Sequence, residues 1–314
     1  MNKCFPDSSK SPCGGFRGRR FPDWLKKPIS FRNSYKSVAS CLTENNLHTV
    51  CVEARCPNRA ECFSAGTATF LIMGNICTRC CGFCGVYHGK PLLLDPEEPQ
   101  KVATAARDLN LRHIVITSVT RDDLPDGGAA HFAETVRQCR NRVPESTIEI
   151  LIPDFRGKQG ALDMVLASRP DILSHNLETV PRLYPKIRPE ADYRNSLDLL
   201  FYFHKTNLST KSGIMVGLGE TEDEVITVLK DLYAAGCRMV TIGQYLQPSK
   251  KQVPVQWYVP PERFAYYEKS GRAMGLRSVF TGPFVRSSYR SLEVLNRQCR
   301  DRKGEMTMGF LPKR

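Results

Sequence analysis

Short apolar segments alternate with amphipathic segments along most of the chain. The first apolar segment, residues 67–74 (TATFLIMG), is rich in Thr, Ile and Phe, which is typical of a buried strand. Later apolar segments predict strands at residues 113–119, 147–153, 171–177, 209–218, 239–246 and 277–283. Helical spacing between them predicts helices at residues 97–108, 129–141, 158–167, 191–204, 221–235 and 260–272.

This alternation decides the expected fold class. Successive strand–helix–strand units predict a parallel sheet, and this many units predict a barrel, complete or partial. We expect an α/β fold, a partial (β/α) TIM-type barrel of about six parallel strands at residues 67–284. An N-terminal extension at residues 21–66, with a helix near 34–46, and a C-terminal extension at residues 285–314 flank it. Residues 1–20 are rich in Ser, Gly, Pro and Arg, and we expect a flexible arm.

The composition indicates one principal domain in a reducing compartment. The chain has 314 residues, 41% of them hydrophobic, and no apolar run approaches the roughly 18 residues of a membrane span. Its 13 cysteines are odd in number and partly grouped in triplets, which favours metal ligation over a disulfide framework. An Arg-containing start can be an organelle transit peptide, but this one is short and carries Asp7, so we expect a cytoplasmic, bacterial protein.

Cys77, Cys81 and Cys84, which we call the loop triplet, have three and then two residues between them. Three thiolates this close in sequence can bind three irons of a cubane cluster, which leaves the fourth iron able to chelate a small molecule. The loop follows the predicted strand at residues 67–74, at the strand end where barrel active sites lie. The alternative is a zinc knot, although zinc normally takes four protein ligands at tighter pairwise spacings.

Cys51, Cys56 and Cys62, which we call the N-terminal triplet, have four and then five residues between them. The different spacing argues against a simple duplication of the loop triplet. A cluster bound here needs a fourth ligand from elsewhere in the chain or from a substrate. Scattered free cysteines are the alternative, but two ordered triplets within residues 51–84 favour two metal sites.

Polar residues gather where the predicted strands end. After the strand at residues 113–119, carboxylates can bond a ribose or an ammonium group, and glycine amides can approach a ligand closely, unless the segment is only a polar turn. The candidates there are Thr120, Arg121, Asp122, Asp123, Gly127 and Gly128. Asn176 and Glu178 stand at the end of the strand at residues 171–177, and Lys211 lies near the start of the next one. The glycine-rich turn after that strand lacks the pattern of a phosphate-binding loop.

With these motifs, the chain resembles the lipoyl synthase family of radical S-adenosylmethionine enzymes over about residues 21–289. The spacing of the loop triplet and the Phe before Cys84 are typical of radical S-adenosylmethionine enzymes in general. The pairing of both triplets with Arg-Ser-Ser-Tyr at residues 286–289 is far more specific. The other matching segments are residues 47–51, 56–58, 67–70, 117–128, 152–155, 175–180, 211–220, 241–248 and 282–285.

The resemblance implies a role for each triplet. The loop triplet would bind a [4Fe–4S] cluster that cleaves S-adenosylmethionine to a 5′-deoxyadenosyl radical. The N-terminal triplet would bind an auxiliary [4Fe–4S] cluster whose sulfides are consumed as the sulfur source. Its fourth ligand would be a serine of the Arg-Ser-Ser-Tyr motif, and we favour Ser288 over Ser287, although the spacing does not choose between them. A serine alkoxide is a poorer iron ligand than a thiolate, which suits a corner that opens when sulfur leaves.

The resemblance also implies the reaction and the partners. The enzyme would insert sulfur at C6 and C8 of a protein-bound octanoyl-lysine to form the lipoyl cofactor, and the polar strand-end residues would contact S-adenosylmethionine. We expect as partners an octanoylated lipoyl carrier domain or H-protein, a ferredoxin- or flavodoxin-type reductant and a cluster-repair protein. The net charge of +13 suits an acidic partner, although it can also be solvated surface. We expect a monomer that binds neither membrane nor nucleic acid.

Two other classes of protein share some of these features. A sulfur-inserting radical enzyme acting on tRNA would also use two clusters, but no RNA-binding motif or basic-aromatic stripe stands out. A non-enzymatic iron–sulfur carrier or a nucleic-acid-binding zinc protein would leave the polar strand ends without a function.

One departure from the family is Cys80, which lies inside the loop triplet but breaks its spacing, so we do not expect it to be a ligand.

Overall fold

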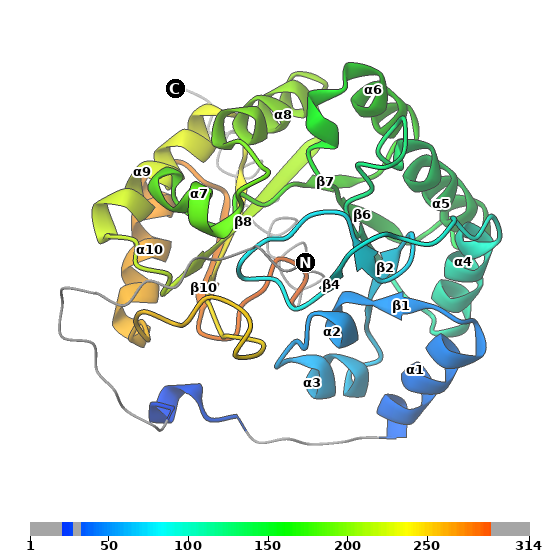
Figure 1. Cartoon of the computed structure of the whole chain (residues 1–314), viewed down its shortest axis with the longest axis horizontal. Coiled ribbons are helices and arrows are strands. Elements are labelled where there is room, and N and C mark those ends of the chain that lie inside the picture. The colour runs from blue at the N-terminus through cyan, green and yellow to red at the C-terminus, as the bar shows by residue number, and fades with distance from the viewer. Residues whose placement is uncertain (1–20, 28–32, 290–314) are drawn as a thin grey trace, which may run out of the picture.

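The computed structural model describes residues 21–27 and 33–289. The predicted arm at residues 1–20 and most of the predicted C-terminal extension lie outside the described residues. The described part is built around one curved sheet with helices on its outer side (Figure 1). No helix in this part is long and apolar enough to cross a membrane.

The sheet contains eight strands in the order β1-β2-β5-β6-β7-β8-β9-β10. The short β1 (His48–Thr49) pairs antiparallel with β2, and the other pairs are parallel. The parallel strands are β2 (Thr69–Ile72), β5 (His113–Ser118), β6 (Thr147–Leu151), β7 (Ile172–Ser174), β8 (Ser209–Val216), β9 (Met239–Gln244) and β10 (Ser278–Gly282). Within the described residues β1 and β10 are unpaired edges, so the barrel is open. The predicted α/β partial barrel is confirmed, with seven parallel strands.

The helices that connect the strands cover the outside of the barrel (Figure 1). They are α4 (Glu98–Asp108), α5 (Ala129–Arg142), α6 (Gln159–Ala167), α8 (Tyr193–Lys205), α9 (Glu222–Ala234) and α10 (Pro261–Ala273). Each begins and ends within two residues of a predicted helix. Local hydrogen bonds explain this agreement, because Thr221 and Glu224 form a capping box on α9 and Asp192 accepts a hydrogen bond from Asn195 N at the start of α8.

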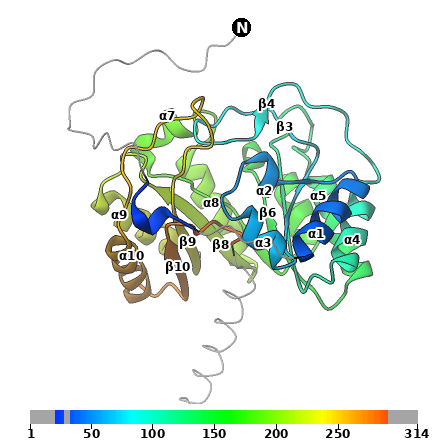
Figure 2. The same cartoon turned by 90° about the horizontal axis from the view of Figure 1, so that it is seen from below.

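Short elements complete the structure on both sides of the barrel. The N-terminal extension forms η1 (Asp23–Leu25), α1 (Asn33–Glu44), α2 (Val50–Glu53) and α3 (Arg59–Ser64). The loops contribute β3 (Ile76–Cys77), β4 (Tyr87–His88), η2 (Phe155–Gly157), η3 (Pro181–Leu183) and α7 (Tyr184–Ile187). Both views place α2 and α3 beside the open side of the barrel, between β1 and β10 (Figures 1 and 2).

The barrel interior holds a buried polar cluster around Glu149 of β6. Lys211 Nζ donates to Glu149 Oε1 at 2.9 Å and Oε2 at 3.1 Å, and Ser174 Oγ donates to Oε1 at 2.7 Å. His113 Nε2 lies 3.2 Å from Oε2. Burial opposes the charge of Glu149, but Lys211 and His113 outweigh it and lower the pKa of this carboxyl to about 2. Lys211 is the third residue of β8, so it lies toward the strand start and away from the C-terminal end.

Its place in this buried polar cluster indicates that Lys211 stabilises the fold. We predict that Lys211→Met lowers the free energy of unfolding by about 3–5 kcal/mol, because it leaves the Glu149 carboxylate buried without its main counter-charge. Urea unfolding measures this loss, and Lys230→Met on the exposed side of α9 is the control, with an expected change within about 0.5 kcal/mol. S-adenosylmethionine binding to reconstituted Lys211→Met should equal that of the wild type. Unchanged stability together with weakened binding would contradict this assignment.

Candidate functional site

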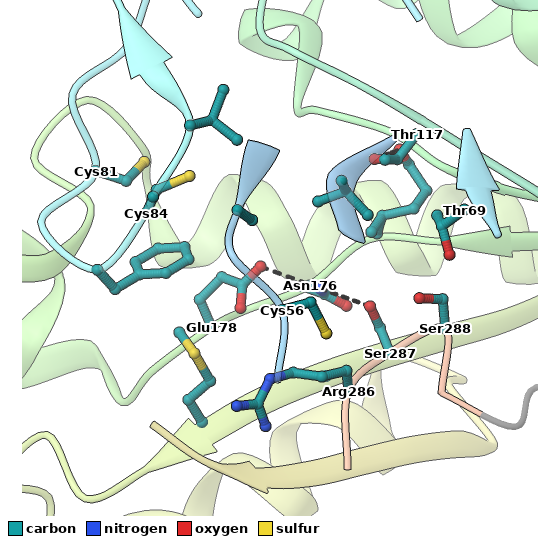
Figure 3. Close-up of a pocket in the computed structure, with 18 of the residues that line it drawn as sticks. Cys56, Thr69, Cys81, Cys84, Thr117, Asn176, Glu178, Arg286, Ser287 and Ser288 are labelled. Carbon is teal, nitrogen blue, oxygen red and sulfur yellow. Dashed lines mark hydrogen bonds between the residues drawn. The ribbon is translucent and has the colours of Figure 1, made fainter. Parts of the chain in front are cut away.

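A pocket of about 330 Å³ opens at the C-terminal ends of the parallel strands. Its walls come from four parts of the chain: the N-terminal helices, the loop after β3, the ends of the barrel strands, and the segment after β10. Five of the six triplet cysteines line it, and Cys62 is the exception. Figure 3 shows Cys81 and Cys84 on one side of this pocket and Ser288 on another. The pocket therefore brings both triplets and the Arg-Ser-Ser-Tyr motif together.

Backbone hydrogen bonds hold the loop triplet at the end of β5. Thr78 donates to Thr120 O from its backbone N at 3.0 Å and from its hydroxyl at 2.9 Å. Two backbone amides point at the first thiol, because Thr120 N lies 3.3 Å and Arg79 N 3.4 Å from Cys77 Sγ. Such amides stabilise a thiolate, the form in which cysteine binds a metal. Thr120, predicted as a contact to the cofactor, thus lies in the pocket and also supports the first cysteine.

The charges of the loop-triplet thiols act on one another. Burial is the main cause that raises the pKa of Cys81 to about 11, and the Cys77 thiolate raises it as well. Burial also raises the pKa of Cys84 to about 12, with further contributions from Cys81 and Cys77. Buried thiols that repel each other's charge keep their protons until a metal replaces them.

The N-terminal triplet forms a second group of the same kind. Cys51 lies in α2, Cys62 lies in α3, and Cys56 N donates to Cys51 O at 3.1 Å in the turn between these helices. Burial and then the Cys56 thiolate raise the pKa of Cys51 to about 11. Burial and then Cys51 and Cys56 raise the pKa of Cys62 to about 12. In each triplet the interacting thiols belong to that triplet, which is the arrangement that two separate clusters require.

The described side chains do not support the zinc alternative. Among them, no group of three or more His, Cys, Asp or Glu residues is arranged to hold a single metal ion. A zinc site needs its ligands within about 2.3 Å of one point, whereas the thiols of a cubane site surround a larger group.

Three buried polar atoms at the pocket wall lack a partner within the described part of the chain. They are Ser118 Oγ, His175 Nε2 and Asn176 Oδ1. Buried polar groups are normally hydrogen-bonded, so these atoms are available to a ligand. His175 Nδ1 lies 2.9 Å from Ile152 O, and burial lowers the pKa of this histidine to about 4. The ring is therefore neutral, and its Nε2 can accept a hydrogen bond.

The segment after β10 returns into the pocket. It passes so close to β9 that a Cβ on Gly243 would lie 2.0 Å from Val285 O, which explains why glycine stands there. Asn176 Nδ2 donates to Ser287 Oγ at 3.4 Å, whereas Ser288 Oγ makes no hydrogen bond with any described residue. Figure 3 shows Cys56, Ser287 and Ser288 around the same part of the pocket. Of the two serines, Ser288 has its oxygen lone pairs free.

Two arginines that line the pocket act on the charge of Glu178. Burial raises the pKa of Glu178, while Arg188 and then Arg286 act in the opposite direction. Arg188 also lies close enough to Cys81 to lower the pKa of its thiol, against the larger effect of burial. Burial lowers the pKa of Arg286, and the Cys56 thiolate opposes this. Each triplet therefore has one arginine beside it, and Glu178 interacts electrostatically with both arginines.

A double ion pair anchors the loop triplet to the barrel. Arg79 lies between Cys77 and Cys81 in sequence and its side chain is 5% exposed. Its Nε and Nη2 donate to Asp122 at 2.7 and 3.0 Å, and its Nη1 and Nη2 donate to Asp154 at 2.8 and 2.7 Å. Although burial opposes their ionisation, Arg79 lowers the pKa of both carboxyls, that of Asp154 to about 2. Both carboxylates are therefore charged throughout the neutral range.

The predicted contacts to the cofactor divide into two groups. Thr120, Asn176 and Glu178 line the pocket, and their contact with the cofactor stays a prediction. Six predicted contacts lie outside its lining: Arg121, Asp122, Asp123, Gly127, Gly128 and Lys211. The segment after β5 is therefore mainly a polar turn that supports the structure.

The partners within that turn account for its sequence. Arg121 Nη2 donates to Asp123 Oδ2 at 2.8 Å, so these two charges neutralise each other. Gly128 is the N-cap of α5 at φ 92°, and a Cβ there would meet Met73 Sδ at 2.2 Å. Asp122 serves Arg79, as described above. The glycine pair thus allows close packing of the turn and not the approach of a ligand.

The sequence reasoning missed several functional candidates. Arg286 is part of the Arg-Ser-Ser-Tyr motif, so the motif could have identified it as a residue of the site. His175 is not among the predicted contacts, although it stands at the end of a predicted strand beside Asn176. Arg79 and Arg188 were not candidates either, and the partners of Arg79 lie far from it in sequence.

Comparison with protein families places this site in a known class. Residues 71–232 match the model of the radical SAM superfamily, and residues 10–56 match the N-terminal domain of lipoyl synthase of the radical SAM family. Solved structures agree in fold: Streptococcus suis SuiB bound to S-adenosylmethionine aligns over 72% of this chain and 54% of its own, with a TM-score of 0.54 at 11% identity. HydG, a maturase of the [FeFe]-hydrogenase, aligns over 73% of this chain and 54% of its own, with a TM-score of 0.55 at 14% identity. The chain thus spans about half the length of these two structures.

The fold and the loop triplet therefore define a radical S-adenosylmethionine enzyme, which uses a [4Fe–4S] cluster and S-adenosylmethionine. Curated relatives narrow the class further. Lipoyl synthase of Oleidesulfovibrio alaskensis is 53% identical over 86% of this chain and 93% of its own length. That of Caldanaerobacter subterraneus is 54% identical over 86% of this chain and 95% of its own. The chain belongs to the lipoyl synthase family.

Cys80 offers a test of which thiols bind the cluster, because it does not line the pocket. Its backbone N donates to Glu190 Oε1 at 3.0 Å, and its thiol lies 3.7 Å from His88 Nε2. We predict that Cys80→Ala keeps reductive S-adenosylmethionine cleavage, whereas Cys81→Ala abolishes it by removing one of only three protein ligands. The rate of 5′-deoxyadenosine formation by anaerobically reconstituted protein measures both. Loss in Cys80→Ala with retention in Cys81→Ala would reverse the ligand assignment.

Proposed function

We propose that this enzyme inserts two sulfur atoms, at C6 and C8 of a protein-bound octanoyl-lysine, and that an auxiliary [4Fe–4S] cluster on the N-terminal triplet donates them. The observation that carries the proposal is that the pocket lined by the loop triplet is also lined by Cys51, Cys56 and Ser288. A radical-generating site alone has no need for three more cysteines and a serine from a distant part of the chain. The lipoyl synthases at 53 and 54% identity supply the reaction class.

The difficulty of the substrate explains why such a site is needed. An unactivated C–H bond has no acidic proton and no electrophilic centre, so acid and base residues cannot attack it. When bound, the loop cluster and S-adenosylmethionine supply a radical that abstracts hydrogen from this bond. Two C–H bonds must be replaced by two C–S bonds, so two molecules of S-adenosylmethionine are needed for each lipoyl group.

The residues of the pocket divide the remaining work. Asn176, Glu178 and the free Nε2 of His175 offer acceptors for the hydroxyl and ammonium groups of S-adenosylmethionine. Leu71, Ile152 and other apolar side chains of the wall suit an alkyl chain and exclude water from the reacting carbon. The substrate chain would thus lie between the two triplets.

Ser288 is the serine that we propose as the fourth ligand of the auxiliary cluster. Its oxygen has no hydrogen-bond partner among the described residues, whereas Ser287 Oγ accepts a hydrogen bond from Asn176 Nδ2. An alkoxide is a poorer iron ligand than a thiolate, which allows that corner to open when sulfur leaves. Arg286, two residues before, adds a positive charge beside the Cys56 thiol.

The partners and the setting form part of the same proposal. The substrate is an octanoylated lipoyl carrier domain or H-protein, electrons come from a ferredoxin- or flavodoxin-type reductant, and a repair protein rebuilds the auxiliary cluster. We also propose that the protein is a monomer. We place it in the cytoplasm, because the cysteines of the described part are all free thiols, as in a reducing compartment.

The sacrificial role of the auxiliary cluster can be tested with one variant. We predict that Cys56→Ala keeps reductive S-adenosylmethionine cleavage and loses sulfur insertion, with iron and sulfide falling from about eight to about four of each per chain. Cys81→Ala is the matched control, which should lose cleavage as well. Wild-type protein with labelled cluster sulfide, and without a repair partner, should make at most one labelled lipoyl group per chain. Many turnovers with unlabelled product would contradict the sacrificial role, and the auxiliary cluster would then act only as an electron relay.

Carrier docking gives a further prediction. With a net charge of +13, the enzyme should bind an acidic octanoylated carrier more weakly as salt rises from low to several hundred millimolar, because salt screens exposed charges. Titration of the carrier at several salt concentrations measures the effect. An affinity that does not change with salt would exclude charge as the basis of docking, and tight, saturable tRNA binding would favour an RNA substrate.

A further inference from the structure

The segment that carries Ser288 is fastened to the N-terminal triplet by residues that have no place in the chemistry. Asn58 Nδ2 donates to Phe284 O at 2.6 Å, and Tyr289 OH donates to Glu61 Oε1 at 2.8 Å. Asn58 is the N-cap of α3 and Glu61 lies inside it, so both stand between Cys56 and Cys62 in sequence. Phe284 and Tyr289 stand on either side of Ser288. The two contacts therefore join the helix of the triplet to the segment of the serine.

One lysine from a third segment touches all four of these residues. Lys27 Nζ donates to Asn58 Oδ1 at 3.1 Å and forms an ion pair with the Glu61 carboxylate. The same ammonium lies over the ring of Phe284 and over the ring of Tyr289, 5.1 Å from each centroid. Its side chain is only 26% exposed. Both rings face a partly desolvated cation, where such contacts are stronger than at an open surface.

This arrangement differs from an ordinary surface lysine. Lys26, the adjacent residue, is 66% exposed and pairs with Asp23 in its own turn. Lys27 instead joins three segments that are distant in sequence: the end of the η1 segment, α3 and the segment after β10. Without its charge, the two rings would lose their common cation, and Glu61 would lose the counter-charge next to Tyr289.

We propose that Lys27 is a positioning residue for the auxiliary site, which holds the segment of residues 284–289 against α3 so that Ser288 reaches the fourth corner of the cluster. This inference rests on the proposed function, in which Ser288 is the fourth ligand. It adds that the corner depends on a cation outside the pocket. Because Ser288 has no hydrogen bond of its own within the described residues, its position depends on the neighbours at 284 and 289.

The test compares Lys27→Met, which keeps the length of the side chain and removes its charge, with Lys27→Arg, which keeps a cation. Lys26→Met is the matched control, and Ser288→Ala is the reference for a missing ligand. All four are made in the full chain with Cys77, Cys81 and Cys84 changed to Ala, so that the auxiliary cluster alone contributes to the spectrum. After anaerobic reconstitution and mild oxidation, the EPR signal of a three-iron cluster reports loss of the corner iron.

We expect the three-iron signal of Lys27→Met to exceed that of the parent protein severalfold and to approach that of Ser288→Ala. Lys27→Arg and Lys26→Met should stay close to the parent. In chains with the loop triplet intact, Lys27→Met should cleave S-adenosylmethionine at the wild-type rate, which separates a local effect from general unfolding.

Each other outcome has a distinct meaning. A parent-like signal in Lys27→Met, with a strong signal in Ser288→Ala, would overturn the role of Lys27 and leave the proposed function intact. A parent-like signal in Ser288→Ala would remove the serine ligand from the proposed function. If Lys27→Met also lost S-adenosylmethionine cleavage, Phe284→Leu would decide, because it removes one ring under the ammonium and keeps the ion pair with Glu61. A parent-like signal in that variant would then overturn the proposal.

Discussion

The two ion pairs of Arg79 fix the geometry on which the rest of the site depends. They join a loop of irregular backbone to carboxylates that follow β5 and β6, so the loop triplet takes its position from the barrel. A buried guanidinium with one carboxylate on each side has its charge matched and its donors satisfied, which makes the arrangement rigid. The polar turn after β5 supports the site, because Asp122 binds Arg79 of the loop and Thr120 N donates to the Cys77 thiol.

The charges around the pocket follow from the same constraint. Burial, and to a smaller extent the repulsion between neighbouring thiolates, raises the pKa values of Cys62 and Cys84 to about 12 each. Metal binding removes this repulsion, but a cluster with thiolate ligands still leaves negative charge in a place shielded from water. Arg188 beside the loop triplet and Arg286 beside the N-terminal triplet supply the opposite charge. Glu178 interacts favourably with both arginines.

The sequence predicts those features that are local. The parallel strands are apolar runs, the helices that connect them have capped ends such as Thr221, and the cysteine triplets are defined by spacing alone, so these features were predicted, whereas short elements such as β1, α2 and α3 were not. The partners of Arg79 and Lys27 lie on other elements, and no local pattern points to them. Lys211 shows a second limit of prediction from sequence. A charged residue in a predicted strand can bind a ligand or pair with a buried charge on another strand, and the sequence does not distinguish these roles. Lys211 is the third residue of β8 and does not line the pocket, and its ammonium donates to the buried Glu149 carboxylate in the barrel interior.

The two triplets are held with different firmness, and this difference fits the different fates proposed for their clusters. The loop triplet is anchored by buried ion pairs, with Arg79 5% and Asp154 7% exposed, and breaking such a pair is costly. The segment with Ser288 is held by Lys27 and Glu61, whose side chains are 26% and 30% exposed, so water screens this ion pair more than it screens the pairs of Arg79. A cluster that must survive every turnover needs the first kind of support. A cluster that loses sulfur and must be rebuilt needs a corner that can open without unfolding the barrel, and only the second kind permits that.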